Sequence, residues 1–192
     1  MTQNGSDPRK HTIAVLVENK FGVLSRVAGL FSARGYNIES LSVGETLDPT
    51  VSRMTLVVRG DEFVMEQVMK QLHKLIDIIK VSDLTDDSHV ERELVLIRVN
   101  AEPQHRAEVL RTADIFRAKV IDVTPQSFTL EATGDEGKLE ALIELLRPMG
   151  IQEIVRTGKV AIARGPKTRA RRPDSGKRAR VSDDPRVVGF AD

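Results

Sequence analysis

The stretch that decides the fold is NKFGVLSRVAGLFSARGYNIES, residues 19–40. Its first four residues predict a tight turn around Gly22. The next apolar residues recur at helical spacing, and Gly35 is typical of a helix C-terminal cap. Asn37 stands just before the next apolar segment. The stretch therefore predicts a turn, a short amphipathic helix and a second turn, and it contains no set of residues suited to covalent chemistry.

Outward from this stretch, apolar patterning predicts a β-α-β-β-α-β unit. Residues 12–18 are β-rich and apolar, as in a strand buried on both faces. Residues 37–44 and 52–59 are predicted strands joined by the turn Asp48-Pro49-Thr50. Asp61 is expected to cap a second helix whose apolar positions are Val64, Val68, Leu72 and Leu75, and residues 77–83 are expected to form a last strand. This order is that of the ferredoxin-like split unit.

The same order then repeats. In the second half we expect strands at 92–99, 117–123, 127–132 and 151–156, helices at 104–113 and after Asp135, and a further strand at 159–163. The tripeptide GDE stands between the third strand and the second helix in both halves, at 60–62 and 134–136. Its position supports an internal repeat. The predicted fold is therefore α+β, with two tandem ferredoxin-like units.

These boundaries predict a domain at 11–84, a polar linker at 84–91, a second domain at 90–165 and a basic, disordered tail at 166–192. Each half has about 75 residues, which is small for a self-sufficient core. A four-stranded sheet with helices on one face also leaves its edges bare. We therefore expect a homodimer formed through the N-terminal unit.

Composition narrows the function classes. The chain has 192 residues, 40% of them hydrophobic and 30% charged, and no cysteine. It has no apolar run long enough for a membrane span and no signal-peptide pattern in its polar first residues, which favours the cytoplasm. The tail carries eight basic and four acidic residues, whereas the rest of the chain is mildly acidic. RNA, an acidic lipid or an acidic protein face could bind this tail, but it lacks interleaved aromatic residues, so nucleic-acid binding is not expected.

The best binding-site candidate is the turn at residues 19–22. The first N–H groups of a helix lack partners and lie at the positive end of its dipole, so a carboxylate can dock at Val23, Leu24 and Ser25. Gly22 permits close approach to the backbone, and the amide of Asn19 both donates and accepts. The arrangement suits a small zwitterion such as an amino acid. Asn and Gly are also common in turns with no ligand, so spacing alone leaves both interpretations open.

A symmetric dimer would add a second set of contacts. Paired edge to edge, it could present Asn37 and Ile38 of one copy to the turn of the other. No nucleotide-binding, metalloprotease or nucleophile-elbow motif is present, and the four histidines do not cluster at metal-ligand spacing. We therefore expect neither a catalytic residue nor a metal site.

Several separated blocks resemble one family. LSRVAGLFSARGYNIESLSVGETLDPTVSRMTLVV (24–58), QLHKLIDIIKVSDL (71–84), VEREL (90–94) and IDVTP (121–125) resemble, in order, the small regulatory subunit of acetolactate synthase, also called acetohydroxyacid synthase. The first block is similar to its N-terminal ACT domain. The resemblance covers roughly residues 11–165, and the tail extends past it.

The resemblance implies a regulatory function. Members of this family bind the large catalytic subunit, raise its activity and confer feedback inhibition by valine or another branched-chain amino acid. Thiamine diphosphate, magnesium and FAD belong to the large subunit, so no cofactor is expected on this chain. Carried over by position, the effector contacts are Asn19, Gly22, Val23 and Leu24 of one subunit with Asn37 and Ile38 of the other. Phe21 is expected to shape the pocket, and Ser25 to support it from behind.

Two rival functions use the same kind of fold. An amino-acid-responsive regulator of transcription would need a helix-turn-helix, and none is evident before His11. A free-standing enzyme would need a catalytic constellation, and regulation of a different enzyme is a third alternative. In the second half, Phe116-Arg117-Ala118 replaces the Arg-Gly-Tyr-Asn of the first half. We therefore expect the ligand site in the N-terminal unit alone.

Overall fold

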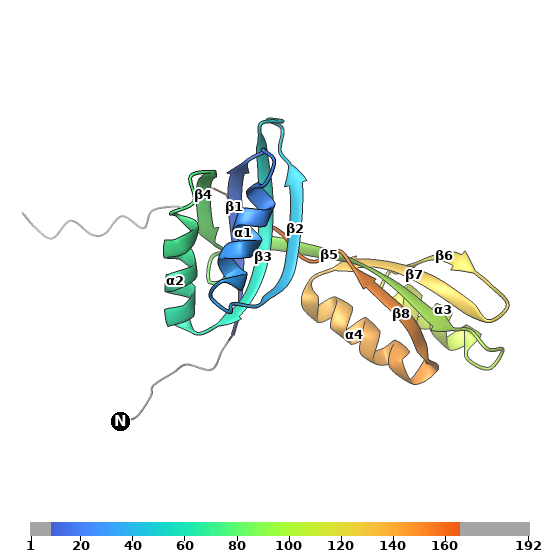
Figure 1. Cartoon of the computed structure of the whole chain (residues 1–192). Helices are drawn as coiled ribbons and strands as arrows, with labels where there is room; N and C mark the ends of the chain where they lie inside the picture. Colours follow the sequence, from blue (N-terminus) through green and yellow to red (C-terminus); the bar gives the residue numbers. More distant parts are fainter. Residues whose placement is uncertain (1–8, 166–192) are drawn as a thin grey trace, which may run out of the picture.

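A computed structural model describes residues 9–165 of the chain as two units placed side by side (Figure 1). The first unit contains β1 (Arg9–Glu18), α1 (Val23–Ser32), β2 (Ile38–Glu45), β3 (Val51–Gly60), α2 (Glu62–Leu72) and β4 (Ile78–Asp83). Its strands form an antiparallel sheet in the order β2-β3-β1-β4. The two helices cover one face of this sheet, and we call the opposite face the outer face.

The second unit repeats this plan. It contains β5 (His89–Asn100), α3 (Arg106–Ile115), β6 (Lys119–Val123), β7 (Ser127–Gly134), α4 (Glu136–Leu146), a 3-10 turn (Arg147–Met149), β8 (Ile151–Arg156) and β9 (Val160–Ala163). The strand order β6-β7-β5-β8 matches that of the first sheet, and β9 pairs with the beginning of β5. The predicted α+β class with two tandem ferredoxin-like units is confirmed.

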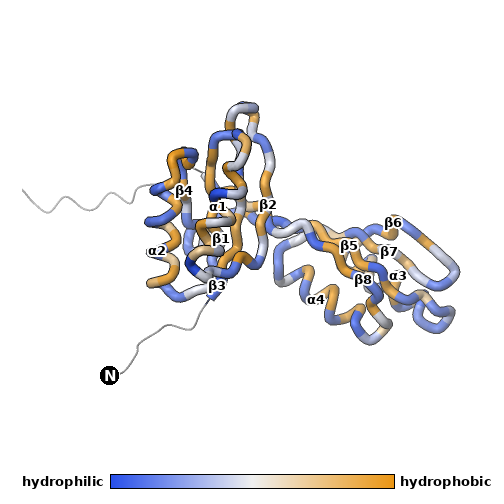
Figure 2. Tube along the Cα trace, viewed as in Figure 1, coloured by the Kyte–Doolittle hydropathy of each residue, from blue (hydrophilic) through white to orange (hydrophobic). Residues whose placement is uncertain are grey.

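Each unit has its own core between sheet and helices. In the first, Ile13, Val15 and Val17 alternate along β1 and are almost fully buried with Val27 and Phe31 of α1. Figure 2 shows hydrophobic residues recurring along the strands and helices of both units. The cores lie on the helix-covered faces, so the outer face of the first sheet is left for other contacts.

The repeated GDE tripeptide has the same structural role in both units. Asp61 accepts a hydrogen bond from the Val64 N–H at 2.8 Å, and Asp135 accepts one from the Lys138 N–H at 2.9 Å. Both aspartates are helix N-caps with extended backbone.

Helix α2 differs in detail from the prediction. It ends at Leu72, before Leu75, and Met65 joins its buried face.

The expected linker at 84–91 is wrong in part. Leu84 is only 1% exposed and packs with Ala14 and Ala161 on the outer face, and β5 begins at His89. The polar composition of this segment predicted a loop, but strand β9 pairs with His89–Arg92 and orders it. Strand β9 thus contacts the outer face of the first sheet as well as β5. The predicted tail at 166–192 lies outside the described residues.

Candidate binding site at the β1–α1 turn

Asn19 fastens the turn after β1 to the β2–β3 hairpin. Its N–H donates to Thr50 O at 2.7 Å. Its side-chain Nδ2 donates to Glu45 Oε1 at 3.0 Å and to Pro49 O at 2.9 Å. Both amide hydrogens are therefore engaged, whereas Oδ1 has no hydrogen-bond partner among residues 9–165. The side chain keeps a free acceptor beside the turn.

Helix α1 begins directly after Gly22, whose φ of +82° is in the left-handed region. Val23 is 3% exposed because its side chain packs in the core, and its N–H makes a long 3.4 Å bond to Lys20 O. The N–H groups of Leu24 and Ser25 have no acceptor within the described part of the chain. The positive end of the helix is thus open, and Val23 could contribute only its backbone.

Asn37 and Ile38 lie at the other end of α1. The helix has ten residues, which corresponds to about 15 Å at 1.5 Å per residue. In Figure 1 the β1–α1 turn and the start of β2 are at opposite ends of the first unit. A single chain therefore does not bring Asn37 and Ile38 to the turn. Strand β2 is an edge of its sheet and, in residues 9–165, pairs with β3 alone, so its outer edge is open to a second copy.

Sequence reasoning missed three charged neighbours of the turn. Glu45 is bound by Asn19, as described above. The Arg26 side chain donates from Nε to Asp77 Oδ2 at 2.7 Å, and a Cβ on Gly22 would lie 3.1 Å from Arg26 Nη1. Asp77 also accepts the Glu18 N–H at its carbonyl. These residues are distant in sequence, and no local pattern marks them.

The corresponding turn of the second unit is built differently. Arg106, the first residue of α3, donates to Ala101 O at 2.8 Å and also to Pro125 O. A guanidinium group thus connects this turn to the β6–β7 loop, where the first unit uses the amide side chain of Asn19 to reach its hairpin. Arg117, after α3, has a φ of +53°, a conformation that the first unit assigns to Gly35. The two turns therefore differ in their side chains, and a ligand site in the first unit alone stays a prediction.

Exposed apolar side chains surround the turn. Phe21 is fully exposed, Leu24 is 46% exposed on α1, and Val43 and Leu47 are exposed on β2 and the hairpin loop. Large apolar side chains left in solvent often mark an interaction surface. They lie on the same elements as Asn19 and its hairpin partners, so an interaction here would enclose the turn.

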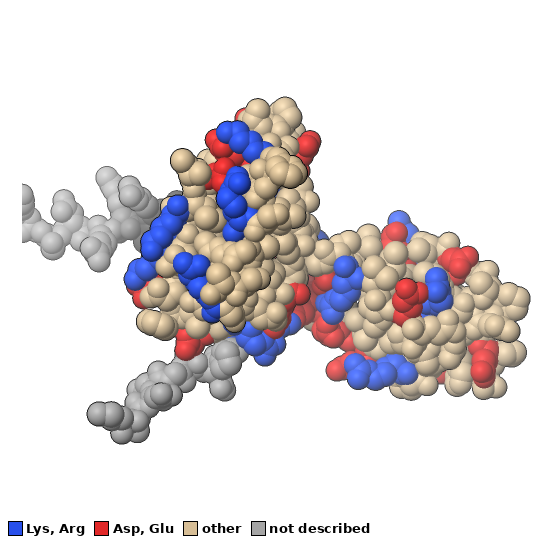
Figure 3. All heavy atoms as spheres, in the orientation of Figure 1, with Lys and Arg blue, Asp and Glu red and all other residues tan. Residues whose placement is uncertain are grey.

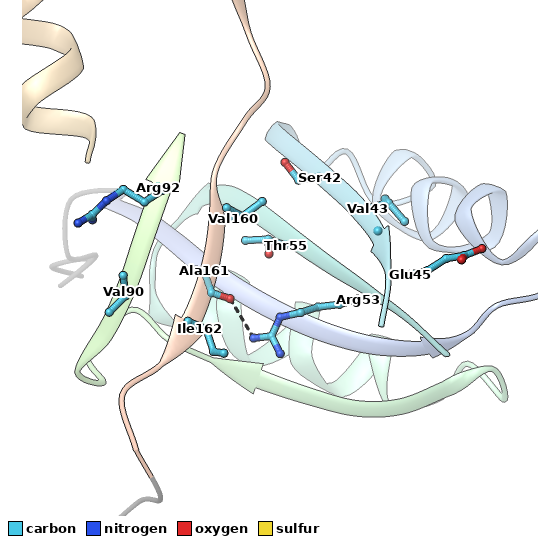
Figure 4. A pocket seen from close by; sticks show the side chains of 11 residues that line it. Ser42, Val43, Glu45, Arg53, Thr55, Val90, Arg92, Val160, Ala161 and Ile162 are labelled. Atoms are coloured by element: carbon cyan, nitrogen blue, oxygen red, sulfur yellow. Dashed lines mark hydrogen bonds between the residues drawn. The ribbon is translucent and has the colours of Figure 1, made fainter. Parts of the chain in front are cut away.

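A separate cavity of about 410 Å³ lies on the outer face between the two units (Figure 4). It is lined mainly by apolar side chains of β2, β5 and β9, among them Val43, Val90 and Val160. Arg53 crosses it and donates to Ala161 O at 2.9 Å. None of the predicted effector contacts lines it, but Glu45, which accepts the hydrogen bond from Asn19 Nδ2, does, so the cavity adjoins the candidate site.

The charged surface carries both signs. On the face shown in Figure 3, basic and acidic side chains lie next to one another, and several gather where the two units meet. Among residues 9–165, no group of His, Asp and Glu has a geometry that could hold a metal ion. None of the described helices is both long and apolar enough to cross a membrane.

Comparison with known proteins decides the family. The model of the AHAS small subunit-like ACT domain matches residues 13–80, and that of the small subunit of acetolactate synthase matches residues 92–165. The chain belongs to the acetolactate synthase small subunits. The probable small subunit of Archaeoglobus fulgidus is 61% identical over 158 residues, which are 82% of this chain and 99% of that protein. The small subunit of Aquifex aeolicus is 60% identical, covering 81% of this chain and 82% of the relative.

A solved structure agrees with this assignment. The crystal structure of the small subunit from Thermotoga maritima superposes with a TM-score of 0.74 at 41% identity, covering 82% of this chain and 99% of that one. The resemblance stated from the sequence is therefore confirmed. In this small subunit, the candidate turn lies within the match to the ACT-domain model.

Proposed function

We propose that this small subunit binds the large catalytic subunit of acetolactate synthase, raises its activity, and makes it sensitive to feedback inhibition by valine or another branched-chain amino acid. It would thereby regulate the biosynthesis of valine, leucine and isoleucine without a catalytic site of its own. The observation that carries the effector assignment is the β1–α1 turn, where Asn19 Oδ1 and the N–H groups of Leu24 and Ser25 all lack a hydrogen-bond partner among residues 9–165.

The turn offers complementary groups to each end of an amino acid. The N–H groups of Leu24 and Ser25 would receive the carboxylate at the positive end of α1. Asn19 Oδ1 would accept a hydrogen bond from the ammonium group, and the Glu45 carboxylate, held beside it at 3.0 Å from Nδ2, would attract that charge. An aliphatic side chain would then face the apolar residues around the turn.

A second copy would complete the site. If two chains pair along β2 about a two-fold axis, the start of one β2 lies beside the far end of the other. Asn37 and Ile38 of the second copy would then reach the turn of the first, and Ile38 would contact the branched side chain of the ligand. Ligand bound across both copies would favour one arrangement of the dimer, and through it one state of the large subunit. Thiamine diphosphate, magnesium and FAD would all reside on the large subunit.

Calorimetry on the full chain with valine, leucine and isoleucine tests the site directly. We expect one of the three to bind, and Asn19→Ala to weaken its binding about tenfold or more because the ammonium loses its acceptor. The matched control is Asn100→Ala, which alters the residue at the end of β5 in the second unit, where Asn100 accepts from Gln152. This control should bind like the wild type.

The reconstituted holoenzyme gives the second measurement. Asn19→Ala should still activate the large subunit while inhibition shifts to higher effector concentration. A wild-type chain that binds none of the three amino acids would refute the proposed effector class. Full sensitivity in Asn19→Ala would show that the effector binds elsewhere.

A further inference from the structure

Strand β2 carries a contact between the two units on its outer face. The segment Thr157–Lys159, between β8 and β9, lies on Ser40 and Ser42. Ser42 Oγ donates to Thr157 O at 3.0 Å, and the Lys159 N–H donates to Ser40 Oγ at 3.1 Å. We call Ser40, Ser42 and Thr157–Lys159 the junction. It joins the strand of the predicted effector contacts to the second unit.

Gly158 permits this close approach. Its φ is +78°, and a Cβ at this position would lie 2.6 Å from Ser40 Oγ and 3.2 Å from Ser42 Oγ. An added Cβ would strain the backbone, and either Ser40 Oγ would rotate or the segment would move away from β2. Either change would disturb the hydrogen bond that Ser40 Oγ accepts from the Lys159 N–H.

Ion pairs hold the junction from both sides. Lys159 is only 12% exposed at its side chain and reaches Glu136 at 2.7 Å and Glu91 at 3.2 Å. Lys10 of β1 bridges the units, with Glu136 at 2.5 Å and Glu39 of β2 at 3.4 Å. These ion pairs connect β1 and β2 of the first unit to α4, β5 and the segment before β9 of the second unit. Partly buried pairs of this kind fix relative position well because breaking one leaves a charge uncompensated.

A β-bulge separates the predicted effector contacts from the junction. The register of β2 on β3 shifts between Ile38, which pairs with Val58, and Ser40, which pairs with Val57. Glu39 is the extra residue, and its carboxylate reaches Arg59 at 2.7 Å. Bulges bend a strand and redirect its side chains. Ser40 directly follows the extra residue, so a displacement of Asn37 or Ile38 would also change the position of Ser40.

We propose that strand β2 transmits the binding of the effector to the second unit through the contact of Gly158 with Ser40 and Ser42. This inference rests on the proposed effector site. A ligand that fixes Asn37 and Ile38 against the partner copy selects one position of the bulge, and the junction couples that position to the orientation of the second unit. Gly158 and Ser40 are positioning residues, since neither contacts the ligand.

The test is Gly158→Ala in the reconstituted holoenzyme, with L-valine as the probe. The variant should bind valine like the wild type by calorimetry on the isolated chain, since the turn is untouched, and should still activate the large subunit. Inhibition should require about tenfold more valine or be lost. The matched control is Gly165→Ala, where φ is +65° but no atom lies within 4 Å of the added Cβ. It introduces the backbone strain without the clash and should behave like the wild type.

A second variant tests the inference if Gly158→Ala does not fold. Ser40→Ala combined with Ser42→Ala removes both junction hydroxyl groups without added volume, and it should shift inhibition in the same direction by a few-fold. It decides the question if Gly158→Ala does not fold or no longer activates.

Each outcome has a separate meaning. If Gly158→Ala folds and its inhibition by valine is unchanged, this inference is overturned and the proposed effector site stands. If Gly158→Ala does not fold or no longer activates, unchanged inhibition in the double serine variant has the same meaning. Loss of valine binding itself would also overturn it, because the junction would then support the site rather than transmit its occupancy. A wild-type chain that binds no valine and is not inhibited by it overturns the inference together with the valine site.

Discussion

Asn19 Nδ2 lies 3.0 Å from Glu45 Oε1, so the first residue after β1 is bound to the last residue of β2. Within residues 9–165, Oδ1 is then the amide atom without a partner, and the bond places a carboxylate beside it. A zwitterion would be oriented by this pair, because Glu45 repels a carboxylate and attracts an ammonium group. The carboxylate end would be directed to the start of α1, where the dipole favours it.

Gly22→Asp should abolish effector binding. An aspartate there must adopt a φ of +82°, and its carboxylate would occupy the start of α1 that the ligand needs. The forced left-handed backbone should cost about 1–2 kcal/mol in the free energy of unfolding. Calorimetry and chemical denaturation measure the two effects. Gly165→Asp, at a φ of +65° in open space, should carry the strain but retain binding. Equal loss in both variants would contradict the site.

Val43→Lys should weaken the proposed dimer. Val43 is 46% exposed on the edge strand β2, and two-fold pairing along β2 would place an added charge from each copy in the interface. We expect the dimer dissociation constant to rise about tenfold or more. Sedimentation velocity across a range of chain concentrations measures it. The control is Val123→Lys on β6, where the valine is 63% exposed in the second unit. A dimer disrupted only by Val123→Lys would place the interface there instead.

Stability should fall in acid partly through Glu136. Hydrogen bonds from Lys10 and Lys159 lower the pKa of Glu136 from 4.5 to about 2. A carboxylate with a lowered pKa in the folded state stabilises the chain above its unfolded pKa, and this contribution is lost as pH falls from about 4.5 to about 2. Since the side chain is 32% exposed, solvent screening reduces the contribution to about 1 kcal/mol.

Denaturation of Glu136→Gln measures this contribution. The variant should be less stable than the wild type at pH 7, and the difference should shrink below pH about 4. Glu144→Gln, an exposed change on the same helix, should show no such pH dependence. A constant difference between Glu136→Gln and the wild type down to pH about 2 would contradict the assignment.

Sequence predicted the elements because each has a strong local pattern. Apolar, β-rich runs located the strands of both units, with period-two alternation in the strand at 52–59, and the aspartates marked the starts of α2 and α4. The site was predictable only in part, since Asn19 and Gly22 belong to one local turn. Glu45 and Arg26 reach the turn through contacts between residues distant in sequence, and Gly158 reaches Ser40 in the same way. The sequence did not predict these partners, because they follow from the packing of the sheet. The buried side chain of Val23 likewise reflects the direction in which α1 leaves the turn.

Ala161 of β9 packs on Ala14 and Leu84, so part of the outer face of the first sheet is covered by the last strand of the described residues. On the ribosome, Leu84 precedes Ala161 by 77 residues, a delay of about 4–15 s at 5–20 residues per second. During that interval the nascent first unit has its helix-covered core, but Ala14 and Leu84 on its outer face are not yet covered by Ala161. Translation therefore imposes an order in which the N-terminal unit reaches its final surface only after most of the second unit has left the peptidyl-transferase centre.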